Sequence, residues 1–368
     1  MSARAVVGVA LAACVVASLL GGILGGLLRV GMALPSTADA AWLGRGALAH
    51  AALVMCGFLG TVIGVERAVA AKRPTAWLAP LASGLAGVAL LAGHGALGGG
   101  LLLAAASLFV AVNVLLWKRQ AAPHTALLLA SAVAWWIGNL LFAIGAEGTA
   151  VLPWWFAFLV MTIAAERLEM TRLMRRRPGA QASLVAILAS LAAGAAWSAF
   201  STAAGGVVFG AALLALAGWL FAFDIARRTV RAEGLSRYMA VCLLGGYAWL
   251  AVGGLAWAAT ALGLPARDAA LHALGLGFIV SMMMGHAPVI LPAIARVKLL
   301  FGGFFYVPLA ALHASLLLRL GAGFANFPWR AQGALLNALA IALFALTAAG
   351  AAIAWRRRHG GRISRTSA

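Results

Sequence analysis

The chain has 368 residues, of which 64% are hydrophobic and only 10% are charged. Soluble domains are about half apolar and about a quarter charged, so this composition excludes a water-soluble globular protein. The apolar share of the chain is roughly 235 residues, enough for about twelve bilayer crossings of about 20 residues each. The sequence therefore predicts an all-α, polytopic membrane helix bundle with almost no chain left for a soluble domain.

Apolar runs separated by charged or Gly- and Pro-rich breaks predict the individual helices. They lie at 5–28, 46–66, 76–95, 99–117, 124–145, 150–168, 181–201, 205–223, 238–262, 268–291, 303–321 and 331–355. The transmembrane bundle then occupies residues 1–355. Residues 356–368 form a basic tail, which we expect in the cytoplasm.

The cations predict the topology independently, because Lys and Arg near helix ends are retained on the cytoplasmic side. With twelve crossings and a cytoplasmic N-terminus, 22 of the 27 cations lie inside. Only five lie outside: Arg29, Arg45, Arg267, Arg319 and Arg330. We therefore expect a multi-pass protein of the bacterial inner membrane with both termini in the cytoplasm. Topology and contact with anionic lipid explain the net charge of +19, so no nucleic-acid partner is expected.

Three predicted helices share a short motif. FLGTVIGVER at 58–67 aligns with FLVMTIAAER at 158–167, and FIVSMMMGHA at 278–287 places His286 where Glu66 and Glu166 stand. The offsets of 100 and 220 residues suggest that the bundle consists of three four-helix repeats. The alternative is chance similarity within an apolar alphabet.

Histidines inside the membrane are candidates for function, because ionisable side chains are costly there. His50 and His272 each lie about one turn into a helix from the outer side, roughly 6 Å below the boundary. Two imidazoles at one depth, from two helices, suit a six-coordinate haem b. The alternative is that each histidine only hydrogen-bonds a neighbouring helix.

The surroundings of these histidines favour the haem interpretation. Gly57 and Gly64 follow His50 by seven and fourteen residues and, in an α-helix, continue its face as a groove for a flat macrocycle. Arg45 and Arg267 each precede a candidate histidine by five residues and are suited to pair with haem propionates. Ordinary close packing is the alternative for the glycines.

The tenth helix carries further candidates. Asp268, four residues before His272, is placed to orient that imidazole. His286 lies fourteen residues after His272, about 21 Å along an α-helix and within roughly 40° of the same face. His286 and His313 are therefore candidate ligands for a second metal, either copper or a second haem.

Two Glu-Arg pairs, Glu66-Arg67 and Glu166-Arg167, lie where the second and sixth helices reach the cytoplasm. They are either interfacial ion pairs or a position for proton uptake, since neighbouring charges adjust the acidity of a carboxyl group.

Other polar residues are expected to have structural roles. His124, at the cytoplasmic start of the fifth helix, is expected at the surface. Tryptophans near predicted helix ends, among them Trp135, Trp154 and Trp155, are expected in an interfacial belt.

Two stretches, HAALVMCGFLGTVIGVERAVA at 50–70 and HALGLGFIVSMMMGHAPVILPAI at 272–294, resemble the signature stretches of the NnrS family. That family comprises polytopic haem- and copper-containing bacterial inner-membrane proteins linked to nitric oxide stress, distantly similar to haem-copper oxidase subunit I. The resemblance implies bound haem, copper and a protective role in nitrosative stress, with His50, His272 and His286 at the family's histidines. The tenth helix lacks a His-x-His pair and the sixth has no histidine, so oxygen reduction with proton pumping is not expected.

Two functions from different classes follow from these residues. The first is a haem-binding protein that binds or turns over a small gas such as nitric oxide, or passes electrons to it from a donor; whether it is an enzyme stays open. The second is a proton-coupled secondary transporter of a small solute, which the helix number, the repetition and the intramembrane charges also fit. A lipid-facing assembly factor is a third alternative.

Overall fold

The computed structural model describes residues 3–33, 41–146, 148–170, 178–295 and 297–363. Across these ranges the only regular secondary structure is helical, and 12 helices are long and apolar enough to cross a membrane. They correspond one to one with the predicted spans. The predictions of an all-α fold and of twelve membrane helices are therefore confirmed, and the chain is a multi-pass membrane protein.

The helices fall into two compact units. Unit 1 comprises Met1–Glu169 and Ala192–Gly205, and unit 2 comprises Met170–Leu191 and Gly206–Ala368. Two helices, α9 (Ala180–Trp197) and α10 (Thr202–Phe223), are divided between the units. This division does not decide the threefold repeat, which stays a prediction.

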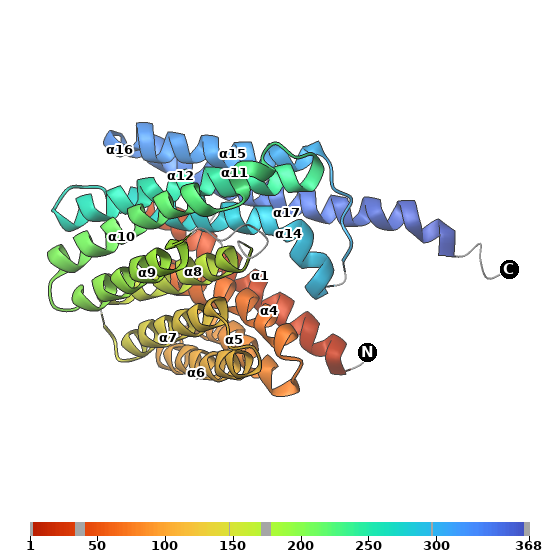
Figure 1. Cartoon of the computed structure of the whole chain (residues 1–368), viewed down its shortest axis with the longest axis horizontal. Helices are drawn as coiled ribbons and strands as arrows, with labels where there is room; N and C mark the ends of the chain where they lie inside the picture. The colour runs from red at the N-terminus through yellow and green to blue at the C-terminus, as the bar shows by residue number, and fades with distance from the viewer. Residues whose placement is uncertain (1–2, 34–40, 147, 171–177, 296, 364–368) are drawn as a thin grey trace. The chain divides into compact units, whose positions relative to one another are not determined.

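Unit 1 is built from antiparallel neighbours along the chain. Helix α5 packs against α6, and α6 packs against α7 (Figure 1). Helix α1 packs against α2 and η1. The elements are α1 (Ala3–Arg29), α2 (Ala41–Leu48), α3 (His50–Ala52), η1 (Leu53–Gly60), α4 (Thr61–Ala71), η2 (Pro74–Trp77), α5 (Leu78–Ala92), α6 (Gly95–Arg119), α7 (Pro123–Ala143) and α8 (Gly148–Met170).

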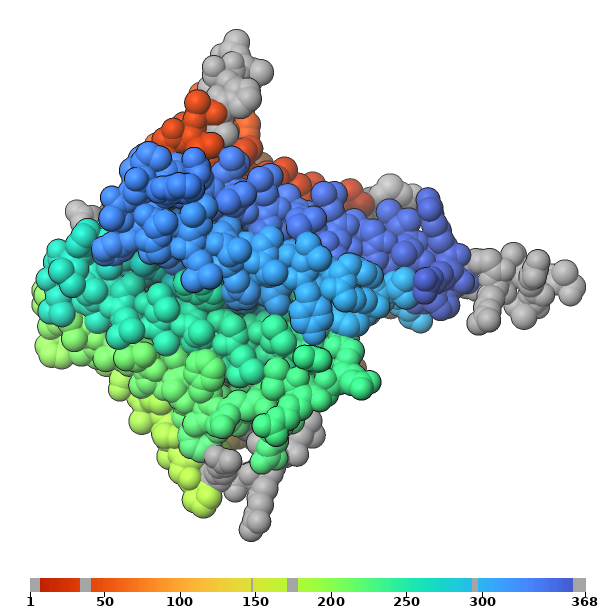
Figure 2. Space-filling model, turned by 90° about the horizontal axis from the view of Figure 1, so that it is seen from above, coloured from red at the N-terminus to blue at the C-terminus, as the bar shows by residue number. Residues whose placement is uncertain are grey.

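Unit 2 is organised around α12, which packs against the consecutive segments α13, η4 and α14. Helix α15 packs against α17, and their blue surfaces lie side by side in Figure 2. The elements are α11 (Ala226–Thr229), α12 (Gly234–Ala261), α13 (Arg267–His272), η4 (Ala273–Val280), α14 (Ser281–Ala295), η5 (Gly303–Phe305), α15 (Tyr306–Leu317), η6 (Leu318–Ala322), α16 (Gly323–Ala325) and α17 (Phe327–Ile363). Helix α17 continues through 356–363, so this part of the predicted tail is helical.

Three tryptophans expected at the membrane interface are buried in unit 1 instead. Trp135, Trp154 and Trp155 are 1%, 9% and 2% exposed. A buried indole N–H needs a partner, and two of them have one: Trp135 donates to the Cys56 sulfur over 3.3 Å, and Trp155 to Asn139 Oδ1 over 3.1 Å. The prediction of an interfacial belt is wrong for these three.

Two π-helical segments lie in the second and tenth spans, at equivalent positions. Segments η1 (Leu53–Gly60) and η4 (Ala273–Val280) are related by 220 residues, the same offset as the sequence motif. The sixth span, α8, has no such segment. The coincidence supports a correspondence between the second and tenth spans. Because π-helices are rare and are frequent at functional sites, both segments mark regions of interest.

The π segments also change which residues share a helix face. A π-helix has more residues per turn than an α-helix, since its hydrogen bonds close at i→i+5. Segment η1 lies between His50 and Gly64, and η4 lies between His272 and His286. The α-helical spacings that put these residues on common faces are therefore wrong.

Candidate functional site

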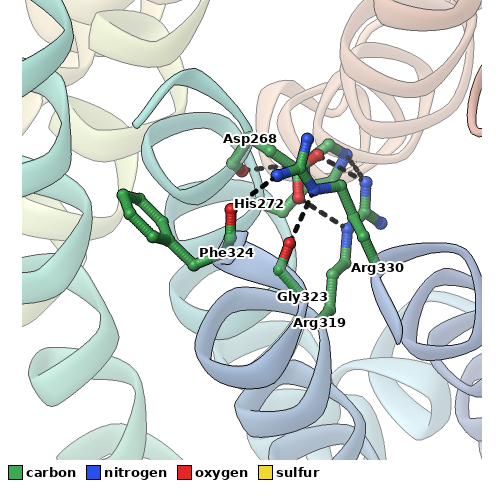
Figure 3. A network of polar contacts seen from close by, with 6 residues as sticks. All are labelled: Asp268, His272, Arg319, Gly323, Phe324 and Arg330. Carbon is green, nitrogen blue, oxygen red and sulfur yellow. Dashed lines mark hydrogen bonds and ion pairs between the residues drawn. The ribbon is translucent and has the colours of Figure 1, made fainter. Parts of the chain in front are cut away.

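A polar network around His272, at the end of α13, is the candidate site (Figure 3). Nδ1 of His272 lies 3.0 Å from the main-chain oxygen of Asp268 and 3.0 Å from its Oδ1. Both oxygens can only accept, so Nδ1 carries the proton and the lone pair is on Nε2. The contact expected between Asp268 and His272 is present.

Arg319, on the π-helical segment η6, completes the network. Its Nε and Nη2 donate to Oδ2 and Oδ1 of Asp268 over 3.0 and 2.8 Å. Nη2 also lies 3.1 Å from Nε2 of His272, which accepts because its lone pair is there. The Arg319 side chain is only 7% exposed, so the bidentate carboxylate pair compensates a charge within a membrane span.

Two further features lie beside Arg319 in the fold. Arg330 donates from Nε to the Gly323 carbonyl over 2.9 Å and from Nη2 to the Phe324 carbonyl over 3.0 Å, which fixes the turn after η6 (Figure 3). Gly333 on α17 has no side chain, and a Cβ there would come within 2.6 Å of the Arg319 Cα. The backbone of α17 can therefore approach η6 closely.

Sequence reasoning counted Arg319 only as an outer cation. The run LLLRLGAG held a usable signal, because an arginine inside an apolar span is costly and needs a partner. Arg267, which the sequence favoured beside His272, is exposed at the first position of α13. Arg45 donates from Nε to the Leu91 carbonyl over 2.6 Å and so caps the end of α5. Propionate binding by Arg45 and Arg267 stays a prediction.

In unit 1, α1 holds the imidazole of His50. Nδ1 of His50 donates to the Gly22 carbonyl over 2.7 Å. One turn on, a Cβ at Gly26 would lie 2.8 Å from the ring. The glycine face of α1 therefore fixes the same tautomer as in His272, with the lone pair on Nε2. His50 and His272 belong to different units, so their joint ligation of one haem stays a prediction.

The groove predicted along Gly57 and Gly64 is filled by neighbouring helices. A Cβ at Gly57 would lie 2.7 Å from the Ser18 hydroxyl on α1, and one at Gly64 would lie 3.1 Å from Pro80 on α5. Both glycines are buried. They are close-packing positions, so the expectation of a macrocycle surface there is corrected.

His286 and His313 differ in tautomer. Nδ1 of His286 donates to the Met282 carbonyl over 2.6 Å, which puts the lone pair on Nε2. Nδ1 of His313 instead accepts from the Trp249 indole over 2.8 Å, so its lone pair is already engaged. Within the described ranges, no group of three or more His, Cys, Asp or Glu side chains is arranged to hold a metal ion. Copper binding by His286 and His313 therefore stays a prediction without geometric support.

The two Glu-Arg motifs come together in unit 1. Nη2 of Arg67 lies 2.5 Å from Oε1 of Glu66 and 3.9 Å from Oε1 of Glu166, so one guanidinium is shared by carboxylates of α4 and α8. Arg167 is only 5% exposed. This cluster fits either alternative of the sequence, the ion pair or the proton-uptake position.

His124, expected at the surface, is 3% exposed. Its Nε2 lies 3.6 Å from Oε1 of Glu169. The expectation is therefore wrong, since this imidazole is buried beside the end of α8. His124 therefore extends the group of ionisable side chains at this end of unit 1.

A comparison with protein families shows which family the chain belongs to. The model of a domain of unknown function, DUF8744, matches residues 7–353. The match covers almost the whole chain, so the protein belongs to this family. No curated protein and no solved structure matches it.

Proposed function

We propose that this member of the DUF8744 family is a haem-binding protein of the bacterial inner membrane that acts in nitrosative stress. It would bind or turn over nitric oxide, or pass electrons to it. The observation that carries the proposal is the contact of His272 Nδ1 with Asp268, 3.0 Å from both the carboxylate and the main-chain oxygen. Histidines that ligate metals almost always donate their second nitrogen in this way.

The donor set fits a haem iron. His50, His272 and His286 each donate Nδ1–H to a main-chain carbonyl and so keep the lone pair on Nε2. Neutral imidazole is the form that iron binds. In His272 the Nε2 lone pair is in contact with Nη2 of Arg319, which has to move before iron can bind. The resemblance of residues 50–70 and 272–294 to NnrS proteins supports the same conclusion.

Each part of the chain has a defined task in this proposal. The carbonyl of Gly22 orients His50, and Asp268 orients His272, so both rings are held in one tautomer and lose little side-chain entropy at binding. The apolar spans around them exclude water. A bound haem would supply reversible one-electron chemistry and, if one axial position is open, a site for a diatomic gas.

The test is the absorption spectrum and iron content of the purified full-length protein. We expect a Soret band, stoichiometric iron and a dithionite-reduced spectrum of a b-type haem. His272→Ala and His50→Ala should each reduce the haem content, whereas His94→Ala, at an exposed position, should not. Absence of a Soret band together with substoichiometric iron would reject the proposal.

One observation favours proton-coupled transport as the second candidate. Arg67 is shared by Glu66 and Glu166 inside two membrane spans, and intramembrane carboxylates mark proton relays in many transporters. A colourless protein that acidifies or alkalinises proteoliposomes in the presence of a solute gradient, and loses this property in Glu166→Gln, would favour transport over haem binding.

A further inference from the structure

We infer that Arg319 is a displaceable cap on the ligand nitrogen of His272, and that a haem carboxylate takes the N–H that the cap releases. The inference rests on the proposed function and concerns the same site. It follows from an unexpected contact, the 3.1 Å distance between Arg319 Nη2 and His272 Nε2.

The first step is that iron and Arg319 would compete for the lone pair on Nε2 of His272. In the neutral imidazole of His272, Nδ1–H is directed to Asp268, so Nε2 offers a single lone pair. Arg319 already donates a hydrogen to it. Iron and this N–H cannot use the same lone pair, so ligation at Nε2 requires Nη2 of Arg319 to leave.

The second step is that Arg319 can leave without losing its counter-ion. Its Nε donates to Oδ2 of Asp268 over 3.0 Å, and a hydrogen on Nη2 goes to Oδ1 over 2.8 Å. Only the second hydrogen of Nη2 is used on His272. When Nη2 moves away from Nε2, the contact of Arg319 Nε with Oδ2 and the contact of His272 Nδ1 with Oδ1 can both remain, so Asp268 keeps the arginine and the imidazole (Figure 3).

The third step concerns the acceptor for the N–H of Arg319 that no longer contacts His272. The Arg319 side chain is 7% exposed, so an N–H that loses its acceptor there is costly unless another acceptor arrives. A bare copper or iron ion brings no such acceptor. Haem b carries two carboxylates, and a carboxylate is the acceptor that a guanidinium prefers. The cap thus selects a metal that arrives with an acidic group.

The uncovering of His272 is tested first, in the haem-free full-length protein. Diethyl pyrocarbonate acylates unprotonated imidazole nitrogens, and mass spectrometry of the His272 peptide gives the rate. We expect Arg319→Leu to raise this rate about tenfold, the effect of one charge-assisted hydrogen bond. Arg319→Lys keeps an ion pair with Asp268 but loses the bidentate contact, so it should show the same increase. It replaces the leucine variant if that variant does not fold. Exposed His94 serves as the rate standard.

Arg330→Leu is the matched control, since it loses two hydrogen bonds beside η6 without touching His272. An equal increase in this variant would mean that general loosening exposes His272, and the cap would be rejected. An unchanged rate in both Arg319 variants would reject it too.

The second arm uses haem b and its dimethyl ester as probes. The wild type should bind the free acid at least about tenfold more tightly than the ester, and Arg319→Leu should bind the two equally. Equal binding in the wild type would overturn the carboxylate assignment. If the wild type binds neither probe, the proposed function and the carboxylate assignment both fail, and the acylation rates still decide the cap separately.

Discussion

Separate and joint removal of the Asp268–Arg319 pair measures how strongly the two side chains are coupled. Two charge-assisted hydrogen bonds of 2.8 and 3.0 Å join them, and the arginine side chain is 7% exposed against 23% for the aspartate. Asp268→Asn leaves a buried guanidinium without its counter-ion, which should cost about 3–5 kcal/mol of unfolding free energy. Arg319→Gln leaves a carboxylate that is less buried than the arginine and still contacts His272, so we expect about 1–3 kcal/mol.

The double variant Asp268→Asn/Arg319→Gln should cost less than the sum of the single changes by about 1.5–3 kcal/mol, because neither charge is then left alone. Equilibrium unfolding by SDS in mixed micelles gives the three differences. Additivity within about 0.5 kcal/mol would refute the buried pair, since independent sites add to that precision. A larger loss for Arg319→Gln than for Asp268→Asn would refute the reasoning from exposure.

Three glycine and arginine substitutions test the packing around the candidate residues. Gly277→Ala places a Cβ against the Trp249 ring and should cost about 1–3 kcal/mol in the same unfolding assay, whereas Gly275→Ala, in the same π segment but facing open space, should be neutral or slightly stabilising. Gly26→Ala, 2.8 Å from the His50 ring, should displace that imidazole and lower the haem content, and Gly8→Ala on the same helix should not; equal haem content in both would contradict the packing of His50 on α1. Arg67→Gln removes the cation shared by Glu66 and Glu166 and should lower the midpoint of thermal unfolding more than Arg73→Gln, which changes an exposed residue; the reverse order would mean that the shared contact adds no stability.

The membrane helices could be predicted from the sequence because one strong term, the transfer of apolar side chains into the bilayer, decides them. The contact between Asp268 and His272 could also be predicted from the sequence. The two residues are four apart, so an α-helix places them about one turn from each other. Such local geometry needs no knowledge of the tertiary structure.

Arg319 could not be paired with His272 in this way, because 47 residues separate them and their meeting depends on the packing around η6 and α17. The prediction of which helix faces Gly64 and His286 occupy is wrong for another reason. Their prediction assumed α-helical periodicity, but η1 and η4 interrupt it, and apolar residues such as those of η4 give no local signal for a π turn.

The length of α17 has a consequence for what lies beyond the lipid. Its 37 residues span about 55 Å, whereas a bilayer with its headgroups is about 40–45 Å thick. An upright α17 would therefore raise about two turns, including the exposed Arg356, Arg357 and Arg358, clear of the headgroups. Those turns would extend from the membrane as a continuous helix. A fluorophore attached at position 358 would then report a single distance from the lipid surface, whereas a flexible tail would give an average over many distances.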